Sequence, residues 1–170
     1  MKCLKSEIPP DSLVRQVFPA DYTDAFRCEI PGEAVFSADD LQVSFWTVMP
    51  GWVNALFRLR NALVKPFGLK GGDSSDSFKK IEQAIRTGDP DGMISVPFKN
   101  ERETVLKLSD KHLDAYLSFY LEKGTDTAAV TVVTVVRFHN LLGKVYFFFI
   151  KPFHKIIIKA MLESTLARFL

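Results

Sequence analysis

The sequence is poor in the residues that build disulfide frameworks and metal sites, since its 170 residues include two cysteines and three histidines. Ligands this few and scattered cannot form a closed structural zinc site at familiar spacing, so no metal is expected. The first ten residues carry charge but no apolar core, so no signal peptide is expected and the protein is predicted to be cytoplasmic. Cys3 and Cys28 could pair in principle, but in that compartment they are expected to be reduced thiols.

Long hydrophobic runs and an excess of charge of one sign are also missing. Lysine plus arginine total 22 against 20 acidic residues, a formal net charge of +2, which is too balanced for a typical nucleic-acid-binding protein. The apolar C-terminal stretch never approaches the roughly 18 to 20 apolar residues of a membrane span. Its interruptions are Lys151, His154, Lys155 and Lys159. We therefore expect no nucleic-acid partner and no transmembrane segment.

The residues that are present predict a single domain over residues 1–170, with residues 1–20 as an N-terminal extension. Hydrophobic residues make up 47% of the chain, enough for the core of one domain. Period-2 and period-3.6 patterns predict strands and helices respectively. The expected elements are strand Tyr22–Ile30, helices Ala38–Thr47 and Trp52–Lys65, an exposed loop Gly68–Ser77, a short helix around Ile81, strands Met93–Phe98, Thr104–Leu108, Leu113–Leu121 and Ala128–Phe138, and helix Leu141–Leu170.

The C-terminal helix is the most informative of these elements. It is heavily apolar and follows directly on a β-branched strand, so it is expected to cover a sheet. The strand Ala128–Phe138 is apolar on both faces. This pattern indicates either that the strand lies at the centre of the sheet or that its second face lines a cavity. The pattern predicts an α+β fold in which a curved antiparallel sheet wraps on a long C-terminal helix, with two short helices after the first strand.

Three segments resemble an uncharacterised bacterial family, domain of unknown function 2867: Leu59–Lys70, Thr131–Asn140 and Gly143–Ile157. The element order is similar to the helix-grip fold of START lipid-transfer domains, polyketide cyclases and the birch-pollen-allergen group (the SRPBCC superfamily). This resemblance implies the helix-grip fold and membership of a superfamily that binds hydrophobic ligands. It implies no particular reaction, because the family has no established one. Some relatives are fused behind an NAD(P)-binding short-chain-dehydrogenase-like domain. No G-x-G-x-x-G turn is present in this chain, so no cofactor is expected.

Arg60 is the first candidate for a binding residue. It falls between Leu56 and Val64 on the apolar side of its predicted helix. Because burying an unpaired charge costs several kcal/mol, Arg60 either pairs with an internal carboxylate or binds an anionic group of a ligand. A structural role is favoured, either as that ion pair or with the guanidinium reaching solvent at the edge of the helix.

Arg137 and His139 share a face of the last strand with Val133 and Val135, and Asn140 follows at the junction with the helix. If this face lines the interior, they form a polar patch for the oxygenated head of an apolar ligand. The favoured alternative places Arg137 and His139 in solvent and Asn140 as the helix cap.

Trp46 and Trp52 flank the corner between the two short helices. They either form an apolar mouth of the cavity or pack in the core, and the sequence favours neither.

His154 lies in an otherwise apolar stretch of the C-terminal helix and has a reference pKa suited to proton transfer at neutral pH. His112 and Asp114 are the partners considered for it, but a structural histidine is the favoured interpretation.

Lys144, Lys151, Lys155 and Lys159 form one stripe along the same helix. The stripe is interpreted as the solvated face of a helix buried on its other sides, in preference to an anchor on an anionic membrane, because four lysines make weak anchoring.

The sequence therefore predicts a domain that binds a small hydrophobic or amphipathic molecule between the sheet and the C-terminal helix, with Arg60 or Arg137 fixing its polar end. One alternative is a cyclase- or isomerase-like enzyme that uses the same pocket, with His154, His139 or Asp114 moving a proton. The other is an auxiliary domain that works with a short-chain-dehydrogenase-like partner, by analogy with the fused relatives.

Overall fold

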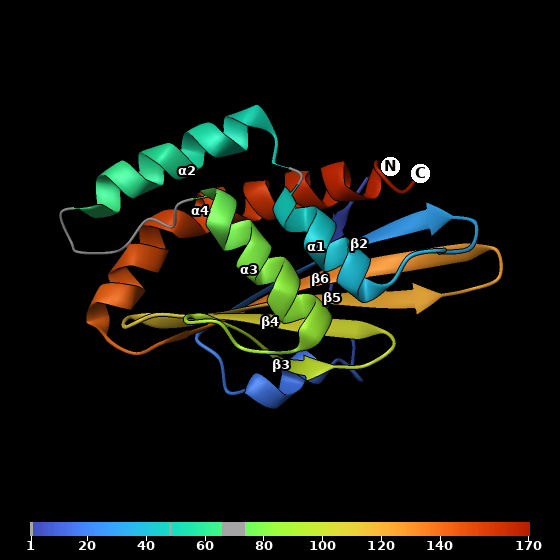
Figure 1. Ribbon diagram of the computed structural model, residues 1–170, viewed down its shortest axis with the longest axis horizontal. Coiled ribbons are helices and arrows are strands. Elements are labelled where there is room, and N and C mark those ends of the chain that lie inside the picture. The colour runs from blue at the N-terminus through green and yellow to red at the C-terminus, as the bar shows by residue number, and fades with distance from the viewer. Residues whose placement is uncertain (1, 48, 66–73) are drawn as a thin grey trace.

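The computed structural model describes residues 2–47, 49–65 and 74–170, and within these it does not describe the side chains of residues 57, 60, 63, 64 and 74–76. Its centre is a curved antiparallel sheet of six strands in the order β1-β2-β6-β5-β4-β3 (Figure 1). The predicted α+β class and the antiparallel arrangement of the last four strands are confirmed. The strands are β1 Leu4–Lys5, β2 Tyr22–Pro31, β3 Ile94–Lys99, β4 Glu103–Ser109, β5 Leu113–Lys123 and β6 Thr127–Phe138.

The strand that is apolar on both faces is central, as one of its two interpretations required. β6 pairs with β2 along one edge and with β5 along the other, so it lies inside the sheet. Val130 and Val132 face one core cluster, and Val133 and Val135 face another. Continuous apolar sequence is the pattern expected of a strand buried on both sides.

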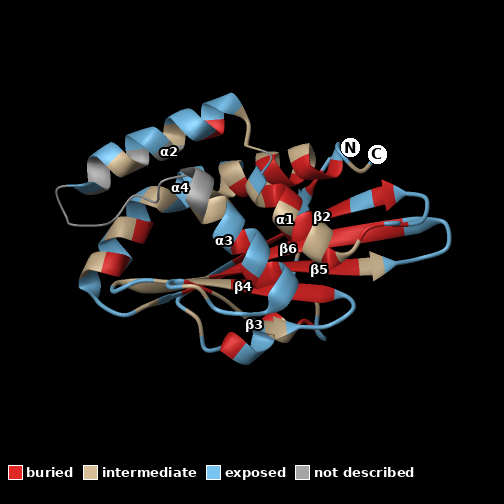
Figure 2. Cartoon of the chain, in the orientation of Figure 1, coloured by how far each residue is buried: buried red, intermediate tan, exposed pale blue. Residues whose placement is uncertain are grey.

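The described residues form four α-helices and a short 3₁₀ helix around the sheet: α1 Ala38–Thr47, α2 Gly51–Val64, α3 Ser74–Thr87, α4 Leu141–Leu166 and the 3₁₀ helix η1 Leu13–Val17. Figure 1 shows α1, α3 and the C-terminal half of α4 over one face of the sheet, whereas α2 stands further from it. Figure 2 shows that α2 is largely exposed along its described residues, with Val53 as its buried contact to the core.

The predicted loop Gly68–Ser77 is wrong at its end, because α3 already begins at Ser74. Serine and aspartate at positions 74–77 are favoured in the first turn of a helix as well as in loops, which explains the error. The rest of the predicted loop lies outside the described residues. Further along α3, Ile81, Ala84 and Ile85 pack on β3 and β4.

Local capping fixes where α1 and α4 begin. The Ser37 side chain accepts a hydrogen bond from the Asp40 amide at 3.1 Å, and the Asp40 carboxylate accepts one from the Ser37 amide at 3.0 Å. Asn140 accepts a hydrogen bond from the Gly143 amide at 3.1 Å, so it caps α4. The alternative that treated Asn140 as a helix cap is therefore the correct one.

The helix α4 changes direction along its length (Figure 1). Pro152 lies inside it and removes one backbone hydrogen bond, which accounts for a bend at this point. Beyond the bend, Ile158, Met161, Leu162 and Leu166 pack onto the sheet. Among the described residues, no helix is long and apolar enough to cross a membrane.

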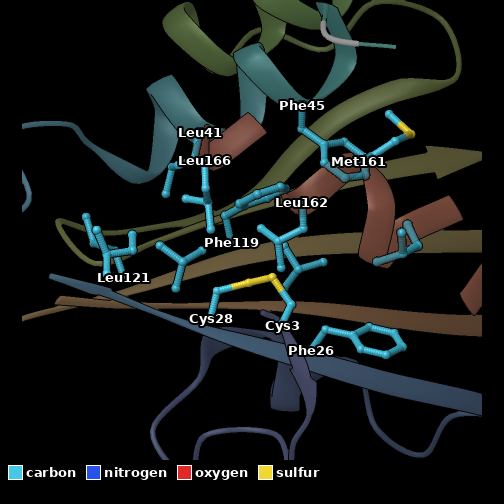
Figure 3. Packing of buried hydrophobic residues seen from close by; sticks show 14 of the residues in the cluster. Cys3, Phe26, Cys28, Leu41, Phe45, Phe119, Leu121, Met161, Leu162 and Leu166 are labelled. Carbon is cyan, nitrogen blue, oxygen red and sulfur yellow. A yellow bond between two sulfur atoms is a disulfide. The ribbon is translucent and has the colours of Figure 1, made fainter. Parts of the chain in front are cut away.

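The N-terminal residues belong to the sheet rather than projecting from it. Strand β1 pairs with β2 so that Leu4 faces Arg27 across the ladder, which places Cys3 opposite Cys28. The two cysteines are fully buried and joined in a disulfide, with Cα atoms 4.4 Å apart (Figure 3). The expectation of reduced thiols is wrong because it rested on an expected compartment and did not consider a strand at residues 4–5.

The second face of the sheet is covered by the segment that follows β1. Val14 and Val17 of η1 pack against Val133 and Val135 of β6. A buried carboxylate ties this segment down: Glu103 accepts hydrogen bonds from the Ser12 hydroxyl at 2.6 Å and from the Leu13 amide at 2.5 Å. The position of η1 therefore depends on a side chain of β4, which lies much later in the chain.

Candidate ligand-binding groove

An open groove of about 440 Å³ lies where α4 passes the β1–β2 edge of the sheet. The apolar part of its lining comes from Phe26 on β2 and from Ile156 and Ala160 on α4. Its volume lies within the range of about 300 to 1,000 Å³ that is typical of small-molecule sites. The charged residues of the lining are Lys5, Asp24, Lys155, Lys159 and Glu163.

Positive charge predominates at this groove, because lysines outnumber carboxylates in its lining. One of the two carboxylates, Glu163, already accepts a hydrogen bond from the Cys3 amide at 3.2 Å. Lysine side chains can extend along an apolar wall while their ammonium groups stay at the opening. The groove thus combines apolar walls with a rim suited to an anionic group.

The other carboxylate, Asp24, belongs to a polar cluster beneath α4. The Tyr22 hydroxyl donates a hydrogen bond to Asp24 Oδ2 at 2.5 Å. His154 Nε2 lies 3.6 Å from the same oxygen and 3.2 Å from Thr134 Oγ1. The Asp24 side chain is 2% exposed, and its Oδ1 has no hydrogen-bond partner among the described residues. Strands β2 and β6 and helix α4 thus bring together side chains that are far apart in the sequence.

Burial sets the protonation states in this cluster. Desolvation lowers the pKa of His154 below its usual 6.5; the charge of Asp24 opposes this shift and that of Lys155 adds to it. Burial, and then the hydrogen bond to Asp24, raise the pKa of Tyr22 well above its ordinary value. At neutral pH the imidazole and the phenol are therefore both neutral. A neutral imidazole beside a carboxylate is able to accept a proton from a bound molecule.

The lowered pKa of His154 predicts a loss of stability in mild acid. The unfolded chain binds a proton at this side chain as the pH falls through about 6.5, while the folded protein does not, so the free energy of unfolding decreases by up to about 1.4 kcal/mol per pH unit. Denaturant titrations of the wild type and His154→Gln between about pH 7.5 and 5.5 measure this effect. The wild type is expected to lose more stability than the variant, and an equal loss in both would contradict the prediction.

Among the predicted site residues whose side chains the structure describes, only His154 lies beside the groove, and it does not meet the partners considered for it. His112 contacts Asn140, with 3.3 Å between its Nδ1 and the amide oxygen. Asp114 Oδ2 lies 3.3 Å from His139 Nε2 and 3.1 Å from Lys107 Nζ. The actual neighbour of His154 is Asp24, which the sequence analysis did not single out.

Arg137 lies on the face of β6 that turns away from α4, and His139 follows directly after the end of this strand. The strand face they share with Val133 and Val135 packs on η1, so the condition for a polar patch inside the sheet and helix is not met. Arg137 is exposed. His139 lines a second, shallow groove of about 430 Å³ at the junction of β6 and α4, together with Asp21, Phe138, Asn140, Leu141 and Lys144.

The remaining candidates lie apart from the groove or outside the described side chains. Trp46 packs against the core and meets Phe45 edge to face, with ring centroids 5.5 Å apart. Trp52 is 45% exposed on α2. The side chain of Arg60 lies outside the described residues. Among the described residues, no three histidine, cysteine, aspartate or glutamate side chains are grouped to hold a metal ion.

Comparison with known proteins gives one match. No curated protein and no solved structure matches the chain. A family model matches residues 18–161, a range that contains strands β2 to β6 and most of α4. It includes Tyr22, Asp24, Thr134 and His154, but not Cys3, Lys5 or Glu163. Because the match covers most of the sequence, the chain belongs to the family described as "Protein of unknown function (DUF2867)".

Proposed function

We propose that this protein binds a small amphipathic molecule, with an apolar body and an anionic end, in the groove between the β1–β2 edge and α4. The observation that carries the proposal is the lining of that groove, in which Phe26, Ile156 and Ala160 lie beside Lys155 and Lys159. Burial of apolar surface would provide most of the affinity, and the lysines would orient the ligand. The lysines take the role that was expected of Arg60 or Arg137.

The proposal includes a helix-grip fold, in which the ligand site lies between the sheet and the C-terminal helix. A curved antiparallel sheet, three helices between β2 and β3, and a long terminal helix support this interpretation. The groove lies at the edge of the sheet that β1 completes. We therefore expect the ligand to enter from the side of the sheet, along α4.

Native mass spectrometry of the protein purified from a bacterial host tests this function. We expect a non-covalent mass that disappears on denaturation and corresponds to an amphipathic acid. Decanoate is a defined probe, and its affinity should fall about tenfold in Lys155→Gln/Lys159→Gln, because two charges at the anionic end are lost. The control Lys79→Gln/Lys123→Gln removes two exposed lysines elsewhere and should bind as the wild type does.

Absence of any retained mass together with no decanoate binding would refute the proposal. Equal affinity in the two double variants would show that binding occurs elsewhere. Conversion of the retained molecule by the wild type, lost in His154→Gln while binding persists, would favour the cyclase- or isomerase-like alternative. The specific support for that alternative is the 3.6 Å approach of His154 to Asp24 beneath the groove.

A further inference from the structure

The side of α4 that faces away from the sheet is apolar instead of polar. Its residues are large and well exposed: Phe148 is 72%, Phe149 68% and Ile156 59% exposed. We call this surface the aromatic face, and it consists of Leu141, Val145, Phe148, Phe149, Phe153 and Ile156. Soluble monomers usually scatter such residues singly, so a continuous row of them indicates an interaction surface.

Helical geometry places the aromatic face opposite the buried side of α4. At 3.6 residues per turn, its members project away from Phe147 and Ile158, which are buried. The lysine stripe runs along one border of this face, between it and the buried side. The stripe consists of Lys144, Lys151, Lys155 and Lys159.

This arrangement changes the interpretation of the lysine stripe. The sequence analysis took the stripe as the solvated face of a helix whose other sides are buried. In the structure a second side, the aromatic face, is also exposed, so the solvent-facing half of α4 is apolar with a cationic border. A helix that only needed solubility would place polar residues at these positions.

We propose that the aromatic face of α4 docks on the surface of an anionic lipid bilayer. Phe148 and Phe149 would enter the boundary between headgroups and acyl chains, while the lysine stripe reaches the lipid phosphates. The charge pattern selects this partner, because α4 has no acidic residue before Glu163 and an anionic bilayer complements an uninterrupted cationic border. The docking is interfacial, with the helix lying in the plane of the surface.

The docking surface is continuous with the proposed ligand groove. Ile156 belongs to the aromatic face and Lys155 and Lys159 to the lysine stripe, and all three also line the groove. A protein docked through α4 would therefore hold the groove near the bilayer, where amphipathic molecules are concentrated. Docking itself does not require the groove to hold a ligand, so the two proposals are tested separately.

Co-sedimentation with lipid vesicles tests the docking of the full chain. The wild type should bind vesicles of phosphatidylcholine mixed with phosphatidylglycerol, and bind weakly to phosphatidylcholine alone or at high salt. Phe148→Ser/Phe149→Ser should lower the partition coefficient at least tenfold, because the inserted rings are lost. Lys144→Gln/Lys151→Gln, which changes no residue of the groove lining, should lower it about 30-fold.

Matched controls remove the same kinds of side chain elsewhere. Val35→Ser removes an apolar side chain that is 91% exposed outside α4, and Lys79→Gln/Lys123→Gln removes two exposed lysines; both should bind as the wild type does. Circular dichroism and thermal melting check that each variant is folded. Equal sedimentation with both kinds of vesicle, or no loss in the phenylalanine variant, would overturn the proposal. A dimer in sedimentation velocity that Phe148→Ser/Phe149→Ser dissociates, without vesicle binding, would assign the face to a second copy instead.

Discussion

Replacing Cys3 and Cys28 together by alanine is expected to lower the free energy of unfolding by about 3.5 kcal/mol, the loop-closure entropy of a cross-link across 25 residues. Both cysteines belong to the core cluster that also contains Leu121 and Leu162, so the substitution also removes some apolar packing. Urea denaturation of the wild type and the double variant measures the difference.

Counting free thiols tests directly whether the disulfide is present. Thiol titration of the denatured, unreduced protein should find no free thiol, and reduction should then expose two. Reduction of the wild type is expected to reproduce most of the stability loss of the alanine variant, since both remove the cross-link. Two free thiols in the unreduced protein would contradict the prediction, and so would identical stabilities of the oxidised and reduced forms.

The disulfide also bears on the groove. Cys3 precedes β1, which carries Lys5 into the groove lining, and the Cys3 amide donates a hydrogen bond to Glu163 on α4. Loss of the cross-link removes the covalent tie between this short edge strand and β2. We expect β1 to detach from β2, and the groove to lose this wall, before the rest of the sheet unfolds. Edge strands of a few residues have little stability of their own.

Strong periodic patterns made much of the fold predictable. The alternation of β5 and the doubly apolar β6 placed both strands, and the Ser37 cap located the start of α1. Strand β1 escaped detection because a two-residue strand carries no periodicity, and it forms only through its pairing with β2. The wrong expectation of reduced cysteines has the same cause, because only the register of β1 against β2 shows that Cys3 and Cys28 lie opposite each other.

The candidate site was harder to predict because it depends on which strand passes under α4. His154 was singled out, but its partner Asp24 was not. The signal was present: the alternation that places Phe26, Cys28 and Ile30 on the buried face of β2 also places Asp24 and Tyr22 on it. A carboxylate on the buried face of a strand is as unusual as an arginine on the apolar face of a helix. The argument that singled out Arg60 therefore applies equally to Asp24.

The aromatic face shows a different limit of sequence reasoning. A long apolar helix is normally assumed to bury most of its surface, since tertiary packing is what usually stabilises such a helix. Nothing in the sequence of α4 separates the half that packs on the sheet from the half that is exposed. Pro152 is visible in the sequence, but its effect on the path of the helix appears only in three dimensions.

Glu103→Ala is expected to destabilise the protein by about 3 kcal/mol, because it leaves several buried donors without an acceptor. Glu103 is fully buried and accepts hydrogen bonds from the Ser12 hydroxyl, the Leu13 amide and the Ser118 hydroxyl, the last at 2.5 Å. Urea denaturation measures the loss. The exposed neighbour Glu101 supplies the control, since Glu101→Ala should change stability by less than about 0.5 kcal/mol.

The substitution of Glu103 is expected to affect only one of the two faces of the sheet. Its partners Ser12 and Leu13 lead into η1, so their release uncovers Val133 and Val135 on the face away from α4. Glu103→Gln keeps one acceptor oxygen and should lose less stability than Glu103→Ala. Equal stability of the Glu103→Ala and Glu101→Ala proteins would show that the N-terminal segment is held by its apolar contacts alone. A loss confined to Glu103→Ala would show that this carboxylate fastens η1, and with it the second core, to the sheet.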